Sequence, residues 1–137
     1  MTGRVSGRRR RGGSVPPATA LATLRPVRST RLLVERVTAG VVGGAEDGAE
    51  TDFDPAEITY ADVFVVVRDG ETSPGPNDWE VTLQTRGPRP LRPGEHDLRL
   101  EAVDGSLLSG RALLRFSDGS RHLFRGDGTL TGFVETP

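Results

Sequence analysis

The sequence predicts an all-β protein: a small antiparallel β-barrel or two-layer sandwich of about six to seven short strands in a meander, behind a disordered N-terminal leader. Two features support this prediction. Runs rich in Val, Leu and Phe recur along the chain, and most alternate with polar residues, which is typical of strands with one face in water. Asp-Gly pairs and proline-rich segments interrupt these runs every 8 to 14 residues, and such residues favour turns.

Residues 1–29 form the predicted leader. They combine Gly, Pro, Ser, Ala and Arg without a sustained apolar period, so they bury too little surface to offset the entropy lost on ordering. Two other interpretations stay open: a secretion signal, although residues 12–19 lack an apolar core, and a true translation start nearer Val27. Residues 30–137 are predicted to be a single domain, because 137 residues with 34% hydrophobic content support one modest core.

The first element of the domain is a run of Leu and β-branched residues at 32–42, which favours a strand. Ser29 before this run and Gly40 within it leave a short helix as the alternative.

An acidic loop is predicted at residues 43–57, and a loop of this length is often functional or mobile. Asp54, Pro55 and Glu57 fit the N-cap, first and third positions of a helix, so a single helical turn is expected at the end of the loop. Asp52, Asp54 and Glu57 also offer oxygen ligands for a hard cation, but their spacing fails the EF-hand pattern. A solvated loop is the simpler interpretation.

Six further strands are predicted from the later apolar runs. Residues 60–68 are apolar on both faces, as expected of a central strand covered from both sides. Trp79 starts the next strand, and its alternation with polar neighbours predicts that it is buried. The expected inward residues of the two strands after that are Leu98, Leu100 and Ala102, then Leu108, Gly110, Ala112, Leu114 and Phe116. Weaker strands are expected at 121–126 and 129–134.

Turns are predicted at four Asp-Gly pairs, because Asp and Gly tolerate the positive φ that tight hairpins require. The pairs lie at 69/70, 104/105, 118/119 and 127/128. The outer face of the last strands is expected to carry a row of arginines that pair with Asp97, Glu101 and neighbouring acids. The row consists of Arg111, Arg115, Arg121 and Arg125.

Charge is distributed unevenly along the chain. All 18 basic residues are Arg, which a high-GC bacterial genome explains most simply. Nine arginines and one glutamate within residues 1–36 give a charge of +8, whereas seven acids and no base within residues 37–67 give −7. A basic leader and an acidic segment are therefore the unusual regions.

No catalytic, cofactor or metal site is predicted. The chain has no Cys, which excludes disulfides, thiolate nucleophiles and zinc sites built on sulfur. No serine lies in a nucleophile elbow, and no Gly-rich loop matches a phosphate-binding pattern. His96 and His122 are the only side chains that ordinarily titrate near neutral pH. We expect His96 at the surface or a sheet edge, and His122 at the barrel mouth or partly inside.

The function that the sequence favours is a noncatalytic interaction or ligand-binding module, because small barrels bind through their loops and mouth. The partner, a protein or a small ligand, is not identified by any motif. One alternative is a nucleic-acid-associated protein in which Arg8, Arg9, Arg10 and Arg11 give weak nonspecific phosphate binding. Another is an enzyme that uses His122 in a barrel cavity.

The expected location is the cytoplasm, without a membrane partner. No run approaches the roughly 18 apolar residues that a membrane-spanning helix needs. Export is kept as an alternative because of the basic leader.

Overall fold

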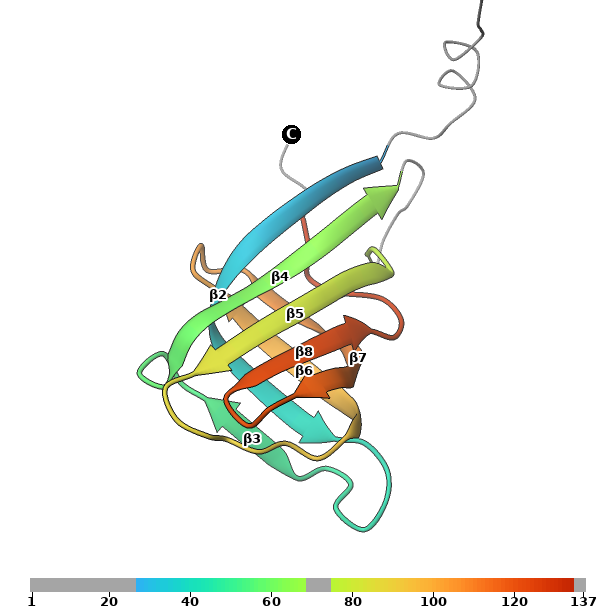
Figure 1. Cartoon of the computed structure of the whole chain (residues 1–137). Helices are drawn as coiled ribbons and strands as arrows, with labels where there is room; N and C mark the ends of the chain where they lie inside the picture. Colours follow the sequence, from blue (N-terminus) through green and yellow to red (C-terminus); the bar gives the residue numbers. More distant parts are fainter. Residues whose placement is uncertain (1–26, 69–74, 135–137) are drawn as a thin grey trace, which may run out of the picture.

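The computed structural model describes residues 27–68 and 75–134, and this part of the chain is all-β, with no helix (Figure 1). The element labels used from here on are those of Figure 1. The strands are β2 (Val27–Val41), β3 (Glu50–Phe53), β4 (Ile58–Arg68), β5 (Asp78–Thr85), β6 (Gly94–Ala102), β7 (Leu107–Ser117) and β8 (Arg121–Gly126).

Six of the strands close into an antiparallel barrel, so the barrel, and not the sandwich, is the correct form of the predicted fold. The ring runs β2-β4-β5-β8-β7-β6 and returns to β2, while β3 is added beside β2. Closure depends on the length of β2, which has 15 residues. Its first half pairs with β4, and beyond an irregularity between Val34 and Arg36 its second half pairs with β6. One strand thus joins both ends of the sheet and leaves fewer open edges.

The predicted meander is wrong, because β5 and β6 follow each other in sequence but lie on opposite sides of the ring. Strand β8 takes the place beside β5, and β7 lies between β8 and β6. The connection 86–93 therefore crosses one end of the barrel, as Figure 1 shows for the yellow segment below the strands.

Three boundaries also differ from the sequence predictions. Strand β2 begins at Val27, so the folded domain starts before residue 30, and residues 1–26 of the predicted leader lie outside the described residues. Residues 43–57 are not one loop, because β3 lies within them and pairs with β2. Residues 129–134 form no strand beyond an isolated bridge between Ser109 and Thr131.

The predicted helical turn at Asp54 is a single hydrogen-bonded turn and not a helix. The Glu57 N–H donates to the Asp54 carboxylate at 3.0 Å and to the Asp54 carbonyl at 3.0 Å. Asp54 therefore caps the turn as the spacing predicts, but no helix continues from it because β4 begins at Ile58.

The predicted alternation of inward and outward side chains is confirmed in β5 and β6. Trp79, Val81 and Leu83 are fully buried, and so, to within 2%, are Leu98, Leu100 and Ala102. Space for the indole is made by two glycines: a Cβ on Gly110 would lie 2.6 Å from the Trp79 ring, and one on Gly126 only 2.3 Å. The indole N–H donates to the Gly128 carbonyl at 2.9 Å, which satisfies its one polar group.

Strand β4 is covered fully on one face only, which corrects the prediction of a strand buried from both sides. Val63, Val65 and Val67 point into the core, whereas Phe64 and Val66 are half-buried on the outer face. The Arg31 guanidinium lies 5.1 Å from the centre of the Phe64 ring and covers it in part.

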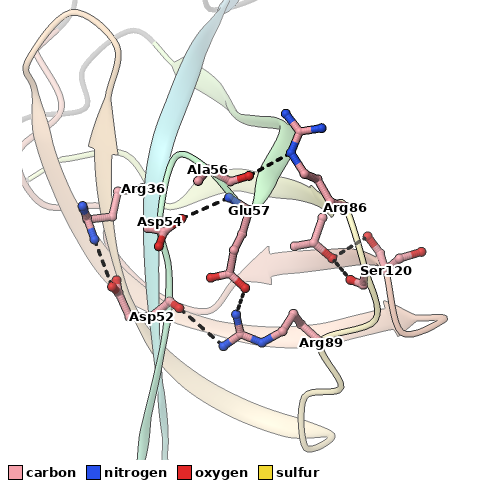
Figure 2. A network of polar contacts seen from close by, with 10 residues as sticks. Arg36, Asp52, Asp54, Ala56, Glu57, Arg86, Arg89 and Ser120 are labelled. Carbon is pink, nitrogen blue, oxygen red and sulfur yellow. Dashed lines mark hydrogen bonds and ion pairs between the residues drawn. The ribbon is translucent and has the colours of Figure 1, made fainter.

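Residues 43–50 are exposed, as the simpler interpretation of a solvated acidic loop predicts, but the acids of the segment also pair with distant arginines. Glu46 pairs with Arg92, Glu50 with Arg99, Asp52 with Arg36 and Glu57 with Arg89. Figure 2 shows part of this network. Arg89 also lies 4.8 Å from the centre of the Phe53 ring. Arg86 donates to the Ala56 carbonyl at 2.8 Å, a bond drawn in Figure 2. The crossing segment 86–93 is thereby held against β3 and the turn that follows it.

Candidate binding surface

A β-bulge at Arg115 decides what the end of β7 presents to solvent. Leu114 pairs with Phe124, but the next partners are Phe116 with Leu123, so β7 carries one extra residue. Such a bulge inverts the inside-outside alternation beyond it. Phe116, predicted to point inward, is 45% exposed on the outer face, while Ser117, itself still exposed, pairs with the buried His122.

Phe116 separates two hollows on the outside of the barrel. One hollow has a volume of about 400 Å³ and is lined by Thr82, Gln84, Phe116, Arg121, His122 and Leu123. The other has a volume of about 310 Å³ and is lined by Leu91, Pro93, Leu114, Arg115, Phe116 and Ser117. We call the two hollows together the Phe116 surface.

The Phe116 surface is cationic. The Arg121 guanidinium lies 5.4 Å from the centre of the Phe116 ring, close enough for a cation–π contact. Arg115 is exposed, and its side chain has no ion pair or hydrogen bond within the described part of the chain. No Asp or Glu lines either hollow.

The other half of the predicted arginine row is paired. Arg111 pairs with Asp97 at 3.0 Å, as expected, whereas Arg125 reaches Asp78 and Glu80 at 3.5 Å. Glu101, the second predicted partner, forms no ion pair among residues 27–68 and 75–134. All four arginines of the row are exposed, as predicted.

His96 is buried, which corrects its predicted place at the surface or an edge. It is 1% exposed and packs edge-on against Phe124 with ring centres 5.7 Å apart. The alternation that buries Leu98 and Leu100 extends back to His96, so the signal was present in the sequence. Burial lowers the pKa of His96, because the core disfavours the charged imidazolium.

His122 is fully buried, deeper than its predicted position at the barrel mouth or partly inside. Its Nδ1 lies 2.8 Å from the Ser117 hydroxyl oxygen, and its ring packs 6.1 Å from the Phe53 ring. Burial lowers the pKa of His122, and nearby Asp118 offsets this only in part. The imidazole is therefore neutral near pH 7.

The Ser117–His122 pair has the reach of a nucleophile and its base, but it lacks two parts of such a site. In the described structure Nε2 of His122 has no hydrogen-bond partner that could orient the ring. An imidazolium formed by proton transfer would also be fully buried. The geometry fits a structural hydrogen bond that holds the bulged end of β7 against β8.

The remaining predicted features have the following positions. Arg8, Arg9, Arg10 and Arg11 lie outside the described residues. Within residues 27–68 and 75–134, no three His, Cys, Asp or Glu side chains gather closely enough to hold a metal ion. The described part of the chain also contains no helix long and apolar enough to span a membrane.

The sequence did not predict the Phe116 surface. Alternation alone placed Phe116 in the core, and a bulge has no unique sequence signature; the polar pair Arg115 and Ser117 around Phe116 fits either register. No protein-family model, no curated protein and no solved structure matches this chain.

Proposed function

We propose that the protein is a noncatalytic binding module and that the Phe116 surface is its contact site. The observation that supports this most directly is the bulge at Arg115, which turns a large aromatic side chain from the core to the solvent. Burying a Phe side chain is worth about 1.5 to 3 kcal/mol, so an exposed one between two hollows favours contact with a partner. Aromatic and Arg side chains are also the residues that dominate binding energies at interfaces.

The proposal of a noncatalytic role is supported by the state of the two histidines. They are the only side chains of the chain that ordinarily exchange protons near neutral pH, and both have essentially no solvent-exposed surface. His122 is among the residues that line one hollow, but it has no solvent-exposed surface there, whereas Phe116 and Arg121 are exposed.

The experiment is a selection of peptides from a random displayed library on the full chain. Bound peptides are then measured against two variants, Phe116→Ser and Leu107→Ser. Leu107 is the matched control, because it is a large apolar residue of the same strand, is 68% exposed, and lies outside both hollows. Trp79 fluorescence and the melting temperature show that each variant is folded.

Peptides whose binding is lost in Phe116→Ser and kept in Leu107→Ser support the proposal. Peptides that bind both variants equally contradict it, since the contact site would then lie elsewhere. Short single-stranded DNA is measured in parallel, because the alternative role in nucleic-acid binding rests on Arg8, Arg9, Arg10 and Arg11. DNA retention that does not change in Phe116→Ser, together with failure of every peptide, would favour that alternative.

A further inference from the structure

The arginines of the described chain are mostly neutralised within the molecule. At least eight of the twelve form ion pairs with carboxylates. Arg115 and Arg121 do not, and these two flank the exposed ring of Phe116. Two guanidinium groups without a carboxylate partner thus lie beside Phe116, which at 45% is the most exposed aromatic side chain of the described residues; Arg86, which also forms no ion pair, donates instead to the Ala56 carbonyl.

The acid in the adjoining turn forms no ion pair with either guanidinium group. Asp118 lies in the turn between β7 and β8, where its carboxylate accepts hydrogen bonds from the backbone N–H groups of Ser120 and Arg121. These backbone bonds, that of Arg121 foremost, lower the pKa of Asp118. The ionised carboxylate holds the hairpin and its charge acts on Arg121 from a distance, but it forms no ion pair with Arg115 or Arg121, so both guanidinium groups can pair with an external anion.

A third hollow on the barrel also contains arginines, but these are paired. A hollow of about 350 Å³ over β2, β6 and β7 contains Arg36 and Arg99, but Asp52 and Glu50 neutralise them. The Phe116 surface, in contrast, combines two unpaired guanidinium groups with an apolar floor. That floor is formed by Leu114, Phe116 and Leu123.

We infer that the partner of the Phe116 surface is an extended protein segment that carries carboxylates next to apolar side chains. This inference rests on the proposed function and names the chemistry of its partner. The apolar side chains would cover Phe116 and Leu123, and the carboxylates would pair with Arg115 and Arg121. Arg pairs with a carboxylate through two parallel N–H donors, so the match adds specificity as well as attraction.

A nucleic acid fits this surface less well. The described residues carry twelve arginines and sixteen carboxylates, a net charge of −4, which disfavours a polyanion that extends beyond the two hollows. Single-stranded nucleic acids also bind to series of aromatic side chains on which successive bases stack, whereas the two hollows are lined by one exposed aromatic side chain, Phe116, and by the buried ring of His122.

The test compares two synthetic peptides on the full chain. The first has two glutamates flanking a Leu-Leu pair, and the second has glutamines in their place; oligothymidylate is the third probe. We expect the glutamate peptide to bind about tenfold more tightly than the glutamine peptide, which corresponds to roughly one charge-assisted hydrogen bond. The double variant Arg115→Gln/Arg121→Gln should reduce this ratio to about one.

Arg36→Gln is the matched control for the loss of one guanidinium, since β2 lies across the ring from β8 and Arg36 lines neither hollow. It should leave the ratio unchanged. Equal binding of both peptides, lost in Phe116→Ser, would overturn the partner chemistry but not the proposed function. Binding that persists in Phe116→Ser would overturn both. Failure of the glutamate peptide to bind, or Phe116-dependent binding of oligothymidylate in preference to it, would also overturn the inference.

Discussion

Acidification from about pH 7.5 to about pH 5.5 should destabilise the barrel through its two buried histidines. His96 and His122 are neutral in the core, and burial lowers the pKa of each below its usual 6.5. The unfolded chain exposes both imidazoles, so they take up protons there as the pH falls through about 6.5. Stability is therefore full above that pH and is lost as the pH falls, because the unfolded state binds more protons than the folded state.

The size of the loss follows from proton linkage. If a histidine stays neutral in the folded state, the change from about pH 7.5 to about pH 5.5 costs about 1.4 kcal/mol of unfolding free energy, and two cost about 2.7 kcal/mol. The total free energy of unfolding of such a domain is about 5 to 15 kcal/mol, so a loss of this size is large enough to measure. One group opposes it: a proton shared with Asp127 raises the pKa of Glu95, which favours the folded state on acidification.

The assay is urea unfolding followed by the fluorescence of the single tryptophan at a series of pH values. His96→Leu and His122→Leu each remove one titrating group and should each halve the pH dependence. The chain has only these two histidines and no Cys, so the double variant should lose nearly all of it in this window. An unchanged slope in the double variant, or a wild-type stability independent of pH, would refute the assignment of buried neutral imidazoles.

Three further predictions concern packing. Leu114→Asp should lower the free energy of unfolding by about 2 to 4 kcal/mol, because the Leu114 side chain packs against the core. Arg115→Asp should leave the melting temperature almost unchanged, because Arg115 is exposed at the bulge. Similar melting temperatures for the two variants would contradict the register. Gly126→Ala should cost about 1 to 3 kcal/mol because its Cβ would overlap Trp79, while Gly87→Ala meets no atom within 4 Å and is the control. Native Trp79 should emit at short wavelength and resist aqueous quenchers; red-shifted, freely quenched emission would show that it is not in the core.

The sequence by itself determined most of the local structure. Alternation around Trp79 identified the inward face of β5, and two Asp-Gly pairs located the β6–β7 and β7–β8 hairpin turns, where Gly105 and Gly119 have φ values of 96° and 98°. The pair at 127/128 ends β8, and Gly128 has the positive φ of 114° there, but no strand follows it. The fourth pair, at 69/70, lies outside the described residues. These features are predictable because alternation and turn conformation depend on residues that are neighbours in the chain.

Only the tertiary structure decided how distant residues meet. Net charge along the chain suggested an isolated acidic segment, but Asp52 and Glu50 find arginines 16 and 49 residues away once β3 lies beside β2. The Phe116 surface has the same origin. The bulge at Arg115 arises from the pairing of β7 with β8, and one extra residue in a pairing register reverses the faces of all residues beyond it. Pairing energy between strands, and not local preference, therefore determined that Phe116 faces the solvent.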